Sequence, residues 1–232
     1  PRFLTQLSQG KIQQNSCYQP LGNFLSLWER GNQMWGKWNT TNALLPDGTY
    51  DYGAPTVAAL LESQQWDFVV MNDYSQAPAD LHNRTLHIEV LKNHYVPLLI
   101  QCGATPVFMM TWAYREEGIH NSEERGNTLE FTRSIHAGYQ SYARTLSEIL
   151  PINQKPRIAP VGLAFYWIHE NNYDMWLKLY HWDGIHPSLH GSFLEGCIIY
   201  CAIFGAVPPK QIAIPEEGGP ESLWVNARAR VM

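Results

Sequence analysis

Short apolar runs alternate along the chain with stretches whose apolar residues recur at helical spacing. The run Phe68–Met71 is bounded by polar residues and predicts a strand of a parallel sheet covered on both faces. Thr105–Thr111 predicts a second buried strand, and Arg157–Val161 a shorter one. Helical spacing predicts helices over Leu86–Cys102 and Thr128–Leu150. This alternation predicts an α/β fold, a three-layer α/β/α sandwich with a parallel, flavodoxin-like sheet.

The N-terminal residues predict the tail of a helix followed by a short strand. Phe3, Leu4 and Leu7 have helical spacing, but no helix-start signal precedes them. Gly10 is expected to end this helix, and Lys11–Tyr18 predicts a strand. We therefore expect the chain to begin within an element, with the first strand of the sheet missing.

The C-terminal part predicts one long helix and then a tail. Leu189–Phe204 is largely apolar, and Ser188 suits its N-cap. Four prolines beyond Gly205 predict an extended tail over residues 206–232, with a last short helix at about Glu221–Ala229. All 232 residues are expected to form a single domain.

Charge and hydropathy restrict the class of partner. The chain has 16 basic and 21 acidic residues, a net charge of -5 and no basic run. This balance argues against a nucleic-acid surface and against binding to anionic membranes. The apolar runs are too short or too interrupted to span a bilayer, so we expect a soluble protein whose partners are small or neutral.

The cysteines and two tripeptides leave the compartment open. None of the four cysteines has metal-knuckle spacing, and Cys197 and Cys201 lie four residues apart on one predicted helix, where buried thiols are expected. Asn39 and Asn83 each begin a glycosylation tripeptide, a weak indication of secretion. Secretion therefore stays open.

Aromatic residues make up 12% of the chain, including nine tryptophans. Many lie beside polar residues or glycine, as in carbohydrate-active proteins, where flat rings stack on sugar faces. A well-filled core with aromatic loop anchors explains the same composition. Both interpretations remain open at this point.

The stretch from His181 to Ser188 combines an acid and a base in one loop. Gly184 allows a tight turn and Pro187 prevents helix through His186. Asp183 can accept a hydrogen bond from one ring nitrogen of His186, which leaves the other nitrogen to take a proton from a serine. Asp-Gly followed by His-Pro is also ordinary turn chemistry, so the pair alone does not decide between the two.

Further candidates follow the predicted strands. Asn72 comes directly after Phe68–Met71, at the sheet edge where sites of doubly wound folds assemble, and its amide can donate to an oxyanion. The alternative is that Asn72 and Asp73 cap the end of the strand. Trp112 and Tyr114 are expected at the same edge, as substrate-contacting walls or as core residues. Trp182, beside the histidine loop, is a third tentative substrate contact.

The sequence from Asp183 to Gly191, Asp-x-x-His-Pro-Ser-x-x-Gly, resembles the last motif block of the SGNH (GDSL-like) hydrolases. The serine esterases among them keep their catalytic Asp and His together near the C-terminus, which implies that Asp183 and His186 are catalytic. Asn72 is similar to the oxyanion-donating Asn of the block Gly-x-Asn-Asp, with Val70 in place of the glycine. The resemblance implies an ester hydrolase that works through an acyl-enzyme without a cofactor or a metal. Its substrate would be a small-molecule or polysaccharide ester, first an acetylated carbohydrate.

The same resemblance implies two further site residues, an oxyanion-hole glycine and a nucleophilic serine. These enzymes use the backbone N–H of a glycine at a strand-to-helix junction in the oxyanion hole, which implies Gly22, with Gly53 as the alternative. Their nucleophile lies in an N-terminal Gly-Asp-Ser or Gly-Asn-Ser block, which these residues lack. Ser16, Ser75 and Ser188 do not fit, so we expect the nucleophile upstream of residue 1.

Two other functions compete with the esterase. One is an SGNH-like glycan-binding module that has lost its nucleophile and keeps its aromatic residues. The other is a metal site made by donors in and near the histidine loop, although Pro187 breaks any helical register there. Its ligands would be His181, Asp183, His186 and His190.

Overall fold

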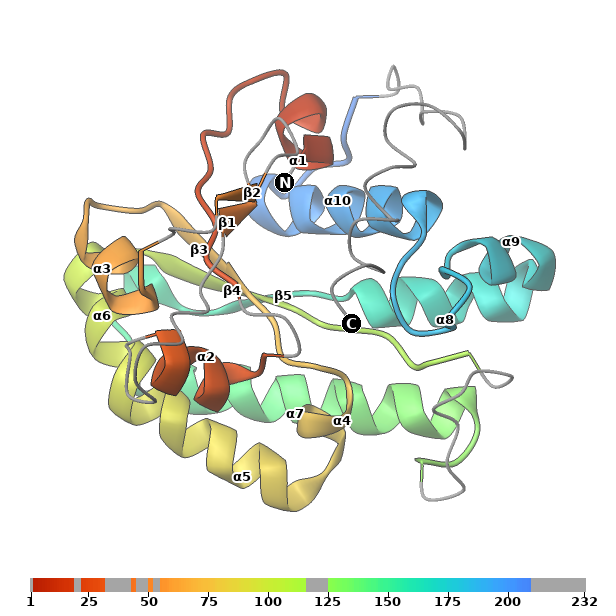
Figure 1. Cartoon of the computed structure of the whole chain (residues 1–232), viewed down its shortest axis with the longest axis horizontal. Helices are drawn as coiled ribbons and strands as arrows, with labels where there is room; N and C mark the ends of the chain where they lie inside the picture. The colour runs from red at the N-terminus through yellow and green to blue at the C-terminus, as the bar shows by residue number, and fades with distance from the viewer. Residues whose placement is uncertain are drawn as a thin grey trace.

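A parallel sheet lies at the centre of the molecule (Figure 1). The computed structural model of the chain describes residues 2–18, 22–31, 43–44, 50–51, 55–115 and 125–209. In these residues the sheet has the order β3-β4-β5, with β3 at Phe68–Met71, β4 at Thr105–Met109 and β5 at Arg157–Ala159. Both pairs of neighbours are parallel. The predicted α/β class and parallel sheet are therefore confirmed.

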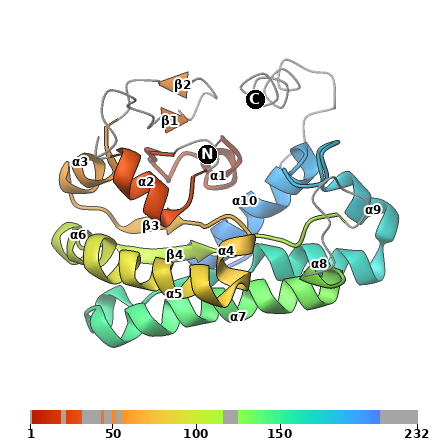
Figure 2. The same ribbon diagram turned by 60° about the horizontal axis from the view of Figure 1, so that its bottom comes forward.

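Helices cover both faces of this sheet, as Figures 1 and 2 show from two directions. One face carries α1 (Arg2–Leu7), α8 (Val161–Asn171), α9 (Tyr173–Lys178) and α10 (Leu189–Phe204). The other carries α2 (Phe24–Gly31), α3 (Val57–Glu62), α4 (Gln76–Ala79), α5 (Leu81–Val90), the π-helical turn η1 (Leu91–Tyr95), α6 (Val96–Cys102) and α7 (Thr128–Ile149). A short 3-10 turn, η3 (Ile152–Gln154), precedes β5, and β1 (Ala43–Leu44) pairs antiparallel with β2 (Tyr50–Asp51).

Strand β4 supplies both hydrophobic cores. Val107 and Met109 belong to the core beneath α8 and α10, whereas Phe108 and Met110 belong to the core beneath α5 and α7. All four side chains are at most 7% exposed. Alternate residues of a strand point to opposite faces, so a continuous apolar run is what a strand between two helical layers requires.

The predicted strands are partly corrected by the structure. Coverage on both faces is wrong for β3, because the Val70 side chain is 40% exposed. In the described residues β3 is also an end strand of the sheet, paired with β4. The predicted strand Lys11–Tyr18 does not form, although the burial of residues 11–16 alternates as in a strand. The predictions Thr105–Thr111 and Arg157–Val161 run two residues too far, and Val161 already begins α8.

The helix predicted at Leu86–Cys102 is longer and less regular than expected. It begins at Leu81, because the Asp80 carboxylate accepts a hydrogen bond from the Asn83 N–H and so caps α5. The first turns of α5 are polar and have no apolar residues at helical spacing. The hydrophobic pattern therefore did not predict them. Instead of a simple kink at Pro97, the π turn η1 joins α5 to α6 just before the proline.

The two long helices follow the sequence closely. Asn127 and Glu130 form a reciprocal capping box at the start of α7. Ser188 caps α10 as predicted, and Gly205 ends it in the left-handed conformation with φ 67°. Residues 210–232, which include the predicted helix Glu221–Ala229, lie outside the described residues. Within the described part of the chain, no helix is long and apolar enough to cross a membrane.

Candidate active site

The loop between α9 and α10 is a closed hairpin-like turn. Tyr180 and Pro187 face each other as an antiparallel bridge, and the Ser188 N–H donates to the Leu179 carbonyl at 2.8 Å. The chain reverses at Gly184, whose φ of 71° favours glycine. The loop is therefore rigidly connected to both helices by backbone contacts.

Asp183 and His186 form a hydrogen-bonded pair inside this turn. His186 Nδ1 lies 2.6 Å from Asp183 Oδ2. The other carboxylate oxygen accepts from the backbone N–H groups of Ile185 and His186, both at 2.9 Å. The Asp183 side chain is 13% exposed and that of His186 is 52% exposed. The acid is thus held in place while the imidazole remains accessible.

The pKa of the Asp183 carboxyl reflects these contacts. Burial acts to raise the pKa, but the hydrogen bond from His186 and the two backbone N–H groups outweigh burial and lower it. His181 is a weaker partner, because its Nδ1 lies 3.9 Å from Asp183 Oδ2. Burial lowers the pKa of His181. The geometry therefore selects His186 as the base held by Asp183.

Ser188 and Gly191 seat the start of α10 against this loop. The Ser188 hydroxyl accepts from the N–H groups of His190 and Gly191 and donates to the Lys178 carbonyl. A Cβ on Gly191 would lie 2.2 Å from the Leu179 carbonyl oxygen, so only glycine fits there. Thus the two ends of the motif from Asp183 to Gly191 serve to position the loop.

The segment after β4 holds the histidine loop at the carboxyl edge of the sheet. The Trp112 indole N–H donates to the Ile185 carbonyl at 2.8 Å, and the Arg115 N–H donates to the Gly184 carbonyl at 2.8 Å. The Ser75 hydroxyl, from the segment after β3, donates to the Trp112 carbonyl at 2.7 Å. These bonds connect the ends of β3 and β4 to the loop that carries His186.

The three aromatic candidates have different surroundings. Trp112 is 6% exposed and stacks on Phe165 with ring centroids 4.6 Å apart, the environment of a core residue. Tyr114 is half-buried and packs edge-on against Phe131. Trp182 is 61% exposed and lies in the same turn as His186. A substrate contact stays a prediction for each of them, and Trp182 is the most accessible.

Asn72 and Asp73, adjacent in the chain, differ completely in burial. Asn72 is exposed, and within the described part of the chain its amide makes one long contact, 3.5 Å from Nδ2 to the Asp73 carbonyl oxygen. Asp73 is fully buried. The amide of Asn72 is therefore available at the sheet edge, and its role as oxyanion donor stays a prediction.

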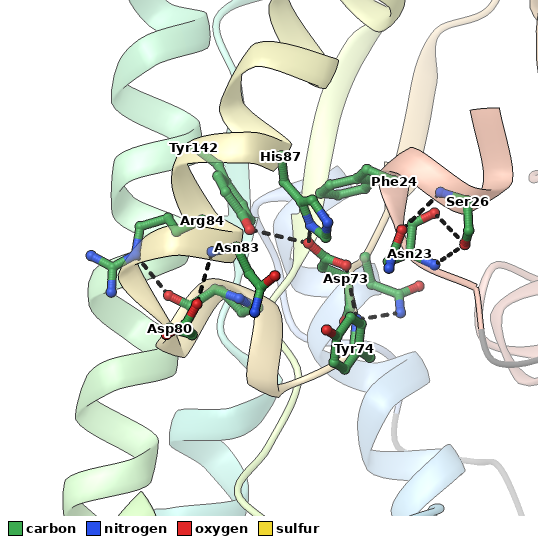
Figure 3. Close-up of polar contacts among 12 residues, drawn as sticks. Asn23, Phe24, Ser26, Asp73, Tyr74, Asp80, Asn83, Arg84, His87 and Tyr142 are labelled. Atoms are coloured by element: carbon green, nitrogen blue, oxygen red, sulfur yellow. Dashed lines mark hydrogen bonds and ion pairs between the residues drawn. The ribbon is translucent and has the colours of Figure 1, made fainter. Parts of the chain in front are cut away.

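The Asp73 carboxylate belongs to a buried network that the sequence analysis missed. His87 from α5 and Tyr142 from α7 both bind its Oδ2, the tyrosine hydroxyl at 3.1 Å (Figure 3). Burial raises the pKa of the Asp73 carboxyl, and the hydrogen bond and charge of His87 oppose that rise. One signal was available: His87 stands four and eight residues before the buried Leu91 and Tyr95, on the face of the helix that packs inward.

Gly22 lies just before α2, whose first residues face this network. Asn23 and Ser26 cap the helix reciprocally, with the Ser26 N–H donating to the Asn23 side chain at 2.8 Å. The Phe24 ring packs against His87 at 6.2 Å between centroids, as Figure 3 shows beside Asp73. Gly22 is thus near the segment after β3, and its part in an oxyanion hole stays a prediction. Gly53 lies outside the described residues.

No protein-family model and no curated protein matches the sequence. The fold is similar to that of a DUF4886 family protein. That protein, from Bacteroides uniformis, aligns with a TM-score of 0.70 at 14% identity, over 99% of this chain and 87% of its own. A proposed SGNH hydrolase from Slackia heliotrinireducens aligns at 23% identity with a TM-score of 0.49, over 62% of this chain and 70% of its own. The first likeness shows a shared fold and extends over nearly the whole chain.

The described residues include no group of three or more His, Cys, Asp and Glu side chains placed to hold a metal ion. The alternative ligand set around His186 is therefore not assembled there. Within the same residues, the ring of His186 has Asp183 as its hydrogen-bond partner and no serine hydroxyl beside it. What the arrangement offers chemically is an oriented imidazole with about half of its side chain exposed.

Proposed function

We propose that this protein is a serine esterase-type hydrolase that cleaves carboxylic esters through an acyl-enzyme. His186 takes the proton of a serine hydroxyl, and Asp183 holds the imidazole in the right tautomer and stabilises the imidazolium that forms. The serine attacks the ester carbonyl, and the Asn72 amide and the Gly22 N–H donate to the oxyanion. Collapse of this intermediate breaks the ester C–O bond and leaves the acyl-enzyme, and the departing alcohol takes the proton from His186. Water, activated by the same histidine, then releases the acid.

The 2.6 Å contact between His186 Nδ1 and Asp183 Oδ2 is the observation that carries this proposal. It orients the ring so that Nε2 is directed away from the carboxylate, and the ring is half exposed. A histidine used only for packing would be buried on both sides. Here the fixed acid and the accessible base have the division of roles that nucleophile activation requires.

The proposal includes a nucleophilic serine outside the 232 residues. The Ser75 and Ser188 hydroxyls are occupied by backbone carbonyl groups, those of Trp112 and Lys178. In the described residues β3 has one unpaired edge, while residues 11–16 alternate in burial without forming a strand. An additional strand that pairs with this edge would end at the carboxyl side of the sheet, near Asn72, and could carry the serine there.

Acetylated carbohydrate is the proposed substrate class. Trp182 is exposed beside the catalytic pair, and an exposed indole offers a flat apolar face on which a sugar ring can stack. The net charge of -5 also favours a neutral substrate over an anionic one.

Ester hydrolysis by two versions of the protein tests the proposal. The 232-residue chain should turn over p-nitrophenyl acetate at the uncatalysed rate, and a version extended upstream should show serine-esterase turnover. His186→Ala in the extended version should remove nearly all of it, because the serine loses its base. Robust turnover by the 232-residue chain, or an active His186→Ala variant, would contradict the mechanism.

A glycan-binding module is the second candidate, favoured by the same exposed Trp182. If the residues upstream hold no serine, the extended version will be inactive on esters and will still bind acetylated polysaccharide. Binding that disappears in Trp182→Ala, without any esterase activity in the parent, would establish the module in place of the enzyme.

A further inference from the structure

Asp73, at the carboxyl edge of the sheet, has a hydrogen-bond partner for each of its polar atoms. Its backbone N–H donates to the Tyr139 hydroxyl at 3.0 Å, and that hydroxyl donates to the Asp73 carbonyl at 3.1 Å. Its Oδ1 accepts from the Tyr74 N–H at 3.1 Å, and its Oδ2 binds His87 and Tyr142. All four polar atoms of Asp73 are therefore fixed by the protein itself.

The partners come from two helices that lie side by side. His87 belongs to α5 and Tyr142 to α7, as Figure 3 shows, and Tyr139 also belongs to α7. Asp73 is 0% exposed and His87 is 2% exposed. This network ties the turn after β3 to the helical layer below it, and no water or substrate is needed to satisfy the carboxylate.

A buried acid–histidine pair is an expensive way to stabilise a fold. Well-packed apolar residues of the same volume are often as stabilising as a buried ion pair or more so, whereas a buried pair in some proteins fixes one specific arrangement. The residue before Asp73 is Asn72, which is exposed and whose amide, among the described residues, contacts the Asp73 carbonyl at 3.5 Å. An exposed side chain can be aimed accurately only if its backbone is held.

We infer that Asp73, held by His87, Tyr139 and Tyr142, is a positioning residue for Asn72 and sets the place of its amide in the oxyanion hole. This inference rests on the proposed function. According to this inference, the site contains a second, buried acid–histidine pair, Asp73 and His87. This pair positions the oxyanion donor and takes no part in proton transfer to or from the substrate. Asp183 and His186 orient the base, and Asp73 and His87 orient the donor.

A double-mutant cycle tests the inference in the upstream-extended enzyme, with p-nitrophenyl acetate as the substrate. Asp73→Asn should lower kcat by roughly ten- to hundredfold and leave KM within about twofold, less than the ~10²–10³-fold cost of deleting an oxyanion donor. In an Asn72→Ala background, Asp73→Asn should lower kcat by less than about twofold, because the donor that Asp73 positions is already absent. An equal loss in both backgrounds would overturn the inference.

Two further variants separate positioning from general damage. Tyr142→Phe removes one 3.1 Å hydrogen bond without changing any charge, and should show a smaller loss with the same dependence on Asn72. Asp80→Asn makes the same acid-to-amide change seven residues away, keeps an N-cap for α5, and should leave kcat within about twofold. Loss of activity in Asp80→Asn comparable with that in Asp73→Asn would also overturn the inference.

A measurement on the 232-residue chain keeps this inference separate from the proposed function. The side-chain amide resonance of Asn72 in ¹⁵N-resolved NMR should be single in the parent and should shift or broaden in Asp73→Asn, but not in Asp80→Asn. If the extended enzyme is inactive on all esters, the proposed function is wrong. The spectrum still tests whether Asp73 positions Asn72. An Asn72 resonance that is identical in the parent and in Asp73→Asn would refute the positioning role.

Discussion

In the Asp183–His186 pair, the mostly buried carboxylate orients the ring and the accessible imidazole is the candidate base. The carboxylate receives three hydrogen bonds within four residues of chain, so its place is set by the turn itself. The imidazole receives its orientation from the carboxylate and keeps half of its surface exposed. The geometry of the pair is therefore set mainly by contacts within the turn.

This construction predicts a low pKa for Asp183. Its carboxyl should titrate below 3.8 in the folded protein, because the hydrogen bonds outweigh burial. A folded pKa below the unfolded value of about 3.9 means that the contribution to stability is fully present above that pH. The contribution is lost as the pH falls through the folded pKa. A ¹³C NMR titration of the carboxyl carbon measures the midpoint directly.

His186→Phe is the matched control for that titration. The ring hydrogen bond that lowers the Asp183 pKa is removed while the backbone N–H donors remain, so the midpoint should rise. An unchanged midpoint would show that His186 does not stabilise the carboxylate, and it would weaken the case for a catalytic pair.

Whether a pair of interacting residues could be predicted from the sequence depended on how far apart the two residues are along the chain. Asp183 and His186 are three residues apart, and a turn with Gly184 brings them together wherever the loop lies. Asp73 and His87 are 14 residues apart on different elements, and their pairing needs α5 packed against the end of β3. No local pattern carries that information, so the second pair appeared only in the structure.

At the scale of elements, α10 and the loop before it form one unit through Gly191. Gly191→Ala would place a Cβ 2.2 Å from the Leu179 carbonyl oxygen, and the helix start or the loop must then shift. We expect a loss of about 1–3 kcal/mol in the free energy of unfolding, the usual cost of overpacking. Denaturant unfolding monitored by circular dichroism measures this loss.

Gly196→Ala is the control in the same helix. Its added Cβ would meet the Phe3 Cβ at 3.1 Å, a milder approach than 2.2 Å to a backbone oxygen, and alanine also has the higher helix propensity. It should be destabilising by less than Gly191→Ala. If the two variants lose equal stability, the close approach of α10 to Leu179 is not the constraint that the geometry indicates.

At the scale of the whole molecule, the sheet and its two cores follow from patterns of burial. The apolar run of β4 predicted a strand covered on both faces, and Val107 and Phe108 lie in opposite cores. The run of β3 was equally apolar, yet Val70 is exposed. A hydrophobic run predicts a buried strand, but it does not predict which edges of that strand pair with other strands. Lys11–Tyr18 shows the same limit, since residues 11–16 alternate in burial but are not assigned to a strand.

Hydrogen exchange can show whether β3 gains a neighbour when the upstream residues are present. The β3 amides that face away from β4 have no strand partner in the described residues and should exchange quickly in the 232-residue chain. In the extended version a strand paired with this edge would protect them, whereas the amides of β4, which already lies between two strands, should change little. Equal exchange of the β3 amides in both versions would rule out a strand at this edge. The serine would then have to reach His186 from another direction.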